Sequence, residues 1–290
     1  MGDFFKKRLF NNNKKNFDIT SLPLNRRELF KKIFFTRFPK LLKINILAFV
    51  FFLPLIAWDL ACKIFKTNFK EVNELFTFVL YTELPLKIIL FIILFIGLAG
   101  SIYYIRKLSW GEPVPLFRTF GQGIKQSYKQ FIFFGVISSL FMTLFELATY
   151  MLRFVDYSPI YMIIFIALLV FALALFVSIM SYSLTMSSLY FMKIRTICKY
   201  SYILTIKRIV FNTLISLITY GLLLPLLLIG NVVFYLIGIV VLAVIGISYI
   251  ILVWVLYCNS SYDIYINYEQ YPLLYRKGLK KIEKEVVNNA

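Results

Sequence analysis

The chain has 290 residues, of which 60% are hydrophobic and 19% aromatic, and its mean hydropathy is +0.79. A soluble domain of this length could not hide so much apolar surface from water, so the composition excludes a soluble globular protein. The formal net charge is +18, and the chain has no histidine, which is the commonest general base and metal ligand. The class that remains is an integral membrane protein.

Six apolar segments are long enough to cross the hydrocarbon core as helices, which takes about 20 residues each. In chain order these predicted spans are Ile44–Leu60, Leu86–Ile105, Phe131–Leu152, Pro159–Ser181, Ile209–Ile229 and Val232–Tyr257. The last two adjoin at Gly230-Asn231, a dipeptide suited to a tight turn, and we expect them to form a hairpin. The sequence therefore predicts an all-α membrane protein with about six transmembrane helices and short amphipathic lead-in helices on the cytoplasmic side.

The distribution of cations predicts the orientation of these spans. Four segments hold 27 of the 32 Lys and Arg residues: the N-terminal arm to Lys43, Arg106–Lys129, Lys193–Arg208 and the C-terminal tail. By the positive-inside rule, both termini lie in the cytoplasm. We expect a multi-pass protein of the bacterial cell (plasma) membrane, since the bias towards Phe, Ile, Lys, Asn and Tyr is typical of AT-rich bacterial genomes. Its expected regions are a basic cytoplasmic arm with an amphipathic helix (1–40), a six-helix transmembrane domain (41–258) and a cytoplasmic tail (259–290).

A similar lead-in precedes the first, third and fifth predicted spans. The three lead-ins read "RRELFKKIFFTRFPKLLK", "FRTFGQGIKQSYKQ" and "IRTICKYSYILTIKR", and each mixes cations with apolar residues at three-to-four spacing. This spacing suits a helix that lies in the membrane interface. In the first, the residues expected to face lipid are Leu29, Phe30, Ile33, Phe34 and Phe38. Duplication of a lead-in and two spans would explain the similarity, and so would shared positional constraint.

The segment from Asp59 to Glu83 is the only sizeable external segment that this topology leaves. Within it, "NFKEVNELFTFVLYTE" has apolar residues at helical spacing. We expect a short helix that lies on the outer surface, and a lid over a pocket is the alternative.

The stretch "WGEPVPLFRTFGQGIKQSYKQF", Trp110 to Phe131, contains a glycine pair, a feature that phosphate-binding loops share. A dinucleotide fingerprint needs a preceding strand and a GxGxxG run, and a P-loop needs GK[ST]; Gly121-Gln122-Gly123 meets neither requirement. Pro113 and Pro115 should stop the helix that leaves the second span. We therefore predict a turn followed by an interfacial helix, with the glycines serving flexibility or close packing.

Several polar residues lie inside or beside the predicted spans. Apart from Asp59 at the very end of the first span, Glu146 is the only acid within a predicted span. Pairing with Arg153 near the outer surface is one interpretation, and a substrate or proton site is the other. The end of the fourth span and the residues that follow it carry hydroxyl side chains on one helix face, among them Ser181 and Thr185. Asn212 lies near the start of the fifth span. These residues either pack against neighbouring helices or line a polar cavity. The candidate polar membrane positions are Glu146, Arg153, Ser181, Thr185 and Asn212.

The sequence shows no catalytic constellation. No Ser–His, Cys–His or paired-carboxylate arrangement is present, and the three cysteines lie far apart without CxxC spacing. We therefore expect no catalytic residues, no cofactor and no metal, and a membrane enzyme acting on a lipid-linked substrate is only a third option. A charge of +18 could indicate nucleic acid, but the cations cluster at the cytoplasmic ends of apolar runs, where anionic lipid headgroups attract them. The candidate cytoplasmic interface residues are Arg118, Lys125, Lys129, Arg195 and Lys199.

The chain also resembles a known family. The matching residues, which lie within about residues 40 to 281, are Leu53-Pro54, Tyr103 to Lys107, Glu112-Pro113-Val114, Phe117, Phe120, Gly123, Lys125, Gln126, Lys129, Gln130 and the tail "NYEQYPLLYRKGLKK". In these motifs the chain is similar to the YesL-like family of bacterial membrane proteins. That family has no known biochemical activity and tends to be encoded near carbohydrate uptake systems, so the resemblance implies no catalytic or binding residues.

Two functions follow as expectations. The first is a non-enzymatic accessory or regulatory partner of another membrane protein, such as an ABC transporter for carbohydrate. The second is a small-molecule or lipid transporter in its own right. The expected partners are a bilayer with anionic headgroups and a membrane protein, with no nucleic acid, and the sequence leaves the oligomeric state open.

Overall fold

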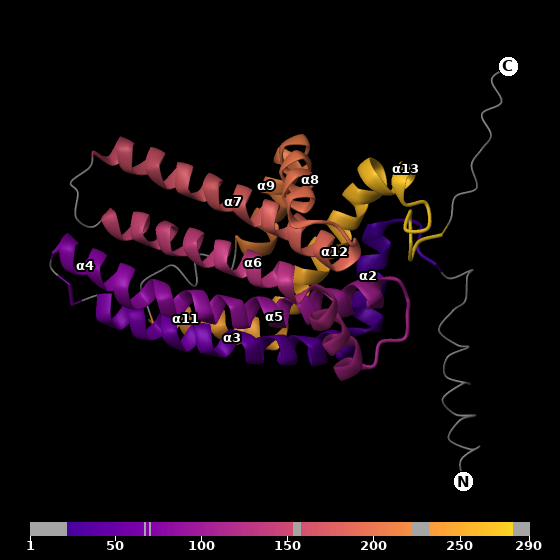
Figure 1. The fold of residues 1–290 in the computed structure, drawn as a ribbon, viewed down its shortest axis with the longest axis horizontal. Coiled ribbons are helices and arrows are strands. Elements are labelled where there is room, and N and C mark those ends of the chain that lie inside the picture. The colour runs from indigo at the N-terminus through magenta and orange to yellow at the C-terminus, as the bar shows by residue number, and fades with distance from the viewer. Residues whose placement is uncertain (1–21, 67, 70, 153–157, 222–231, 281–290) are drawn as a thin grey trace, which may run out of the picture.

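The computed structural model describes residues 22–66, 68–69, 71–152, 158–221 and 232–280, and these ranges are helical without a strand. Five helices in them are long and apolar enough to cross a membrane, and a sixth span is formed if one bent pair is counted as a unit. The long helices run side by side along the long axis of the molecule (Figure 1). This confirms the predicted class, an all-α membrane protein with about six spans.

The first two spans are longer than the sequence suggested. Helix α3 (Phe38–Lys66) continues through Pro54 to Lys66, and α4 (Val72–Phe78), η2 (Val79–Glu83) and α5 (Leu84–Ser109) form one continuous helix of 38 residues. The expectation of a separate helix on the outer surface within Asp59–Glu83 is therefore wrong. A single turn of π-helix at η2 accommodates an extra residue without breaking the helical hydrogen bonds, so α4 extends α5.

The third span is α6 (Leu116–Met151), and its lead-in does not form a separate helix. The helix begins directly after Pro115 and runs unbroken for 36 residues through the two glycines. The expected turn at Pro113 and Pro115 is confirmed, since α5 ends at Ser109 and α6 begins at Leu116, and the lead-in passes directly into the span as expected. It is not an interfacial helix of its own, because no proline interrupts α6 and each glycine costs a helix only about 1 kcal/mol.

The other two lead-ins are separate helices. Helix α2 (Arg26–Thr36) begins at Asn25, whose side chain accepts a hydrogen bond from the Glu28 backbone N–H at 2.9 Å. Helix α8 (Ile194–Lys207) is bent by 93° from α9 (Ile209–Tyr220), so the two are perpendicular. The second part of the predicted fifth span and the Gly230-Asn231 turn lie outside the described residues.

The prediction that Leu29 and Ile33 of α2 face lipid is wrong. Leu29 and Ile33 are only 5% and 2% exposed and belong to the hydrophobic core, whereas Phe35 is 76% exposed. Helix α2 packs against α5 and against α12 (Ile247–Tyr262), and those contacts cover the side of α2 that carries Leu29 and Ile33. Tertiary packing therefore determines which face of this amphipathic helix meets lipid.

The remaining spans complete the bundle. Helix α7 (Pro159–Leu189) carries no charge, and the last span consists of α11 (Val232–Val241), η3 (Leu242–Gly246), α12, η4 (Asp263–Asn267) and α13 (Tyr268–Gln270). At η3, the Asn45 amide donates to the backbone oxygens of Leu242 (2.9 Å) and Ala243 (2.7 Å) and accepts from the Ser248 N–H (2.8 Å). Asn45 therefore satisfies backbone groups that the π-turn leaves exposed inside the bundle.

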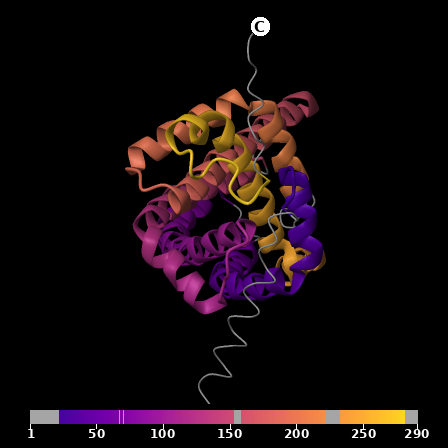
Figure 2. The same ribbon diagram turned by 90° about the vertical axis from the view of Figure 1, so that its right-hand side faces the viewer.

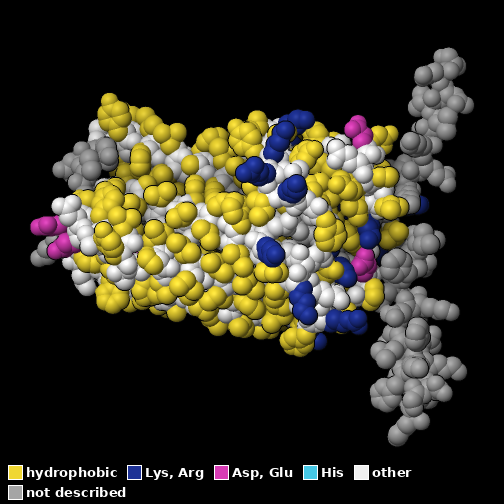
Figure 3. Space-filling model, viewed as in Figure 1, with side chains coloured by type: hydrophobic (Ala, Val, Ile, Leu, Met, Phe, Trp, Pro, Cys, Tyr) yellow, Lys and Arg dark blue, Asp and Glu magenta, His cyan; other side chains and the backbone are white. Residues whose placement is uncertain are grey.

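The two ends of the bundle differ in chemistry. One end, here called the basic end, carries α2, α8 and the tail of residues 271–280, which lie together in Figure 2. In Figure 3 an apolar surface covers most of the length of the bundle, and Lys and Arg side chains gather towards the basic end. The opposite end carries α4. This arrangement matches a bilayer-spanning protein with one cation-rich interface.

Candidate functional site

Four ionised side chains meet inside the bundle near the end opposite the basic end, and we call them the charge quartet: Lys66, Glu83, Lys87 and Glu146. Lys66 Nζ lies 2.6 Å from Glu83 Oε2 and 3.3 Å from Glu146 Oε2. Lys87 Nζ lies 3.0 Å from Glu83 Oε1 and 2.7 Å from Glu146 Oε2. Each ammonium therefore contacts both carboxylates, and the quartet joins α3, the α4–α5 helix and α6.

The quartet is neutral and nearly sealed. The side chains of Lys66, Glu83 and Lys87 are 1–2% exposed, and that of Glu146 is 19% exposed. An isolated buried charge is costly, but two cations and two anions in mutual contact compensate one another. The Tyr150 ring adds a cation–π contact, with Lys66 Nζ 4.9 Å from its centroid. Glu146 is therefore the one member that a solute or proton could approach from outside.

A smaller polar contact lies beside the quartet on α3. Asp59 Oδ2 pairs with Lys63 Nζ at 3.3 Å and accepts a hydrogen bond from the Tyr235 hydroxyl at 2.9 Å. Lys63 Nζ also lies 3.9 Å from the centroid of the Tyr235 ring. This contact is more exposed than the quartet and connects α3 to α11.

Sequence reasoning found one member of the quartet and missed three. Apart from Asp59 at the end of the first span, Glu146 is the only acid in a predicted span, but its expected partner Arg153 lies outside the described residues. The predicted topology places Lys66 and Glu83 in a loop and Lys87 at the start of a span. The four-residue separation of Glu83 and Lys87 on one helix was an available signal. The contacts of Lys66 and Lys87 with Glu146 join residues that are far apart in the sequence, and no local pattern shows them.

The other candidate polar positions belong to a second cluster, which we call the polar core. Asn212 Oδ1 accepts hydrogen bonds from the hydroxyls of Tyr257 (2.7 Å) and Tyr182 (3.2 Å), and Asn212 Nδ2 donates to the Thr205 carbonyl oxygen (3.0 Å). The Thr185 and Tyr262 hydroxyls lie 2.5 Å apart. Both Asn212 and Thr185 are thus held by protein groups from other helices.

The hydroxyl face of α7 lies against its neighbours. Ser178 Oγ is 3.5 Å from Ser216 Oγ of α9, and Thr185 donates to the Ser181 backbone oxygen at 2.7 Å. Ser181 itself is partly buried. The structure therefore brings Thr185 and Asn212 into one neighbourhood through α7, α9 and α12, whereas Glu146 belongs to the quartet.

The five candidate interface cations are all exposed: Arg118, Lys125 and Lys129 on α6, and Arg195 and Lys199 on α8. Large apolar side chains are exposed beside them, with Phe117 at 76% and Phe191 at 92%. An exposed mixture of cations and aromatics suits lipid headgroups or a protein partner.

The tail packs on the Trp110 loop at the basic end. Lys277 Nζ lies 3.0 Å from Glu112 Oε1 and 3.7 Å from the centroid of the Trp110 ring. Gly278 has a φ of +86°, and a Cβ there would lie 2.5 Å from the Ser109 carbonyl oxygen, so only glycine fits without strain. The tail and the Trp110 loop therefore lie in contact, although the sequence separates them widely.

These features define a multi-pass helical membrane protein in which the side chains of the quartet and of the polar core are paired with other protein groups. Within the described ranges, no three His, Cys, Asp or Glu side chains come close enough together to hold a metal ion. Comparison of the chain with protein-family models, with curated proteins and with solved structures finds no match.

Proposed function

We propose that this protein is a non-enzymatic accessory or regulatory partner of another membrane protein in a bacterial plasma membrane, with its basic end in the cytoplasm. In line with its resemblance to the YesL-like family, the partner would be a carbohydrate uptake system such as an ABC transporter. The observation that carries the proposal is a contrast between the interior and the basic end. The polar side chains of the quartet and the polar core form ion pairs and hydrogen bonds with other residues of this protein, while the five candidate interface cations are exposed.

The position of α8 supports this proposal. Because α8 is perpendicular to α9, it lies across the bundle if α9 runs along the membrane normal. Its Ile197 and Leu204 are buried in the core, and Arg195, Lys199 and Tyr202 are exposed. An amphipathic helix held flat at the interface offers a partner both charge and aromatic contact area.

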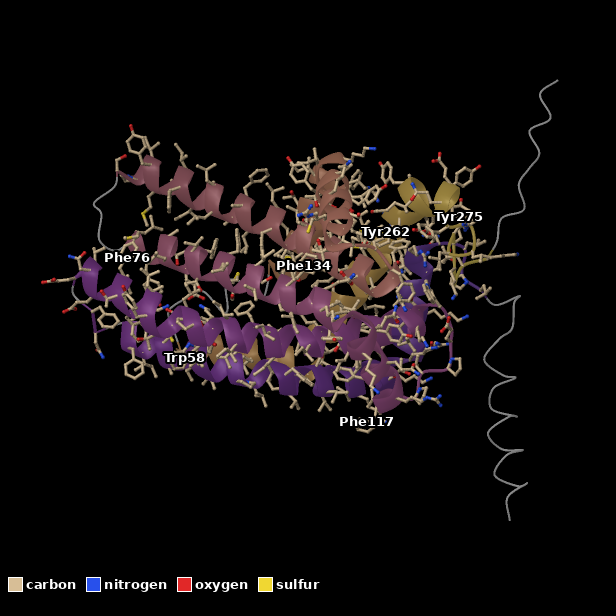
Figure 4. All side chains as sticks on the ribbon, in the orientation of Figure 1. Trp58, Phe76, Phe117, Phe134, Tyr262 and Tyr275 are labelled. Carbon is tan, nitrogen blue, oxygen red and sulfur yellow. The ribbon has the colours of Figure 1, made fainter. Side chains whose placement is uncertain are left out.

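Site-specific photo-crosslinking tests the proposed contact surface. We expect a photoreactive residue at Phe117 or Phe191, in protein expressed in its native membrane, to give a discrete crosslinked product with one partner. Both side chains are exposed and lie beside the cations of α6 and α8. Gel mobility and mass spectrometry of the product would identify the partner. Phe117 is labelled in Figure 4.

Leu144 is the matched control, since it lies on α6 like Phe117 and is 65% exposed, but sits in the apolar part of the helix. It should give only lipid adducts. Equal products at Phe117 and Leu144, or no protein product at any basic-end position, would contradict the accessory function.

A transporter is the second candidate function, and the quartet is the observation that favours it. Ionisable groups at membrane depth often mark proton or ion pathways, and Glu146 is the accessible member. In proteoliposomes with an imposed potential, a proton-coupled transporter should show protein-dependent proton flux that a Glu146→Gln variant abolishes. Flux no greater than that of empty liposomes would remove proton transport from consideration.

A further inference from the structure

A hollow of about 400 Å³ opens on the surface of the basic end, between the start of α2, η4 and the tail. Its lining includes Arg26, Asp263, Tyr268, Tyr275 and Arg276. Tyr275 is labelled at that end of the molecule in Figure 4. The hollow belongs to neither the quartet nor the polar core, so its chemistry is separate from both.

Two guanidinium groups reach this hollow with unused hydrogen-bonding capacity. Arg26 donates from Nη2 to Asp263 Oδ2 (2.6 Å) and from Nη1 to the Lys277 carbonyl oxygen (3.1 Å). Arg276 donates from Nη2 to the carbonyl oxygens of Leu24 (2.7 Å) and Lys280 (3.3 Å). The Nε–H of each arginine is buried and has no acceptor among the described residues. Buried donors without an acceptor are rare, because each costs free energy.

The carboxylate that lines the hollow is already engaged. Asp263 Oδ2 accepts from Arg26, and Oδ1 accepts from Asn267 Nδ2 (2.9 Å) and from the Arg276 backbone N–H (3.2 Å). With Arg26 and Arg276 against this single acid, the lining carries a net positive charge of one. Asp263 therefore positions both arginines and leaves the hollow attractive to an anion.

The start of α2 forms one wall of the hollow, but it is already capped. Leu24, Asn25 and Arg26 line the hollow. The Asn25 side chain accepts a hydrogen bond from the Glu28 backbone N–H (2.9 Å), and the Glu28 carboxylate accepts from the Leu24 N–H (2.9 Å) and from Asn25 Nδ2 (3.0 Å). Because the Glu28 carboxylate offsets the partial positive charge of this helix terminus, the two arginines are the groups that attract an anion.

We propose that this hollow binds a phosphate group, supplied either by free inorganic phosphate or by the headgroup of an anionic lipid. Arginine forks match phosphate oxygens geometrically and form charge-assisted hydrogen bonds with them. The Tyr268 and Tyr275 rings, edge to face with centroids 5.5 Å apart, lie beside the arginines. This inference goes beyond the proposed partner binding and does not depend on it.

Direct binding measurements on the purified full-length protein test the site and separate the two sources. In one arm, inorganic phosphate is titrated by calorimetry against chloride at equal ionic strength. In the other arm, native mass spectrometry compares retention of phosphatidylglycerol with that of phosphatidylcholine. A free-phosphate site responds in the first arm, and a headgroup site retains phosphatidylglycerol in the second.

Three variants assign the binding to the hollow. Arg276→Gln removes one guanidinium group, and Leu24→Trp fills the space from a lining side chain that is 54% exposed. Arg276→Gln should weaken binding about tenfold, the loss expected from one hydrogen bond to a charged group, and Leu24→Trp should weaken it about as much because the indole occupies the space of the anion. Lys40→Gln, which changes an exposed cation on α3 outside the hollow, should change binding by no more than about twofold.

Two results would overturn the proposal. One is wild-type protein that binds neither inorganic phosphate nor phosphatidylglycerol. The other is wild-type affinity in a folded Leu24→Trp variant, which would place any bound anion elsewhere. Thermal melting of each variant confirms that it is folded, and Leu24→Trp carries the test if Arg276→Gln does not fold.

Discussion

A Lys87→Met variant is expected to lose about 3–5 kcal/mol of folding free energy, the cost of removing one partner from a buried ion pair. Lys87 contacts Glu83 at 3.0 Å and Glu146 at 2.7 Å, and Glu83 is 1% exposed. Without Lys87, two carboxylates would share the single ammonium of Lys66 in a place that water scarcely reaches. Denaturant titration or thermal melting in detergent, followed by circular dichroism, measures the loss.

Lys63→Met is the matched control, because Lys63 is 32% exposed and pairs with Asp59 on the same helix face. Exposed pairs contribute about 0–1 kcal/mol, so this change should be small. The double variant Lys87→Met/Glu146→Gln restores neutrality and should lose less than the sum of its single variants. Equal losses for Lys87→Met and Lys63→Met would show that the quartet does not hold the helices together.

The two glycines of the GQG stretch are expected to respond in opposite directions when each is replaced by alanine. A Cβ at Gly123 would lie 2.5 Å from Tyr103 Cβ and 2.9 Å from the Ala99 carbonyl oxygen of α5. Forcing a methyl group into such a contact costs about 1–3 kcal/mol, because a backbone atom cannot move aside as a flexible side chain can. We expect Gly123→Ala to lower the melting temperature, and Gly123→Leu to lower it further.

Gly121→Ala provides the comparison within the same helix turn. A Cβ at Gly121 would have nothing within 4 Å, so the gain in helix propensity of about 0.5–1 kcal/mol should remain. Melting of the three variants beside the wild type checks both directions. Destabilisation by Gly121→Ala similar to that by Gly123→Ala would mean that both glycines supply flexibility and that close packing is not the reason for them.

The quartet also bears on the choice between the two functions. Its four charges neutralise one another, and this pairing suits a structural connection between α3, α5 and α6. A transport role would need Glu146 to exchange its lysine partners for a proton or solute during each cycle. The stability variants therefore test the structural role of the quartet, and the proton-flux measurement independently tests a transport role for Glu146.

Most of the fold could be predicted because membrane spans are determined by local composition. About 20 consecutive apolar residues must cross the bilayer as a helix, whatever surrounds them. The spans around Ile44–Leu60, Leu86–Ile105, Phe131–Leu152 and Pro159–Ser181 accordingly lie within observed helices. Helix ends were less predictable, since α4 continues into the second span where a separate outer helix was expected, and the lead-in of α6 belongs to the same helix as its span where an interfacial helix was expected.

The sequence by itself determined that this is a helical membrane protein with one cation-rich side, because hydropathy and charge are properties of each segment alone. Tertiary structure decided what the polar residues contact. Glu146 contacts Lys66 and Lys87, Arg26 contacts Asp263, and Gly123 contacts α5, and each of these contacts joins two different helical segments. Such contacts depend on how the helices pack, and the hydropathy of a segment does not indicate which helix faces pack against each other.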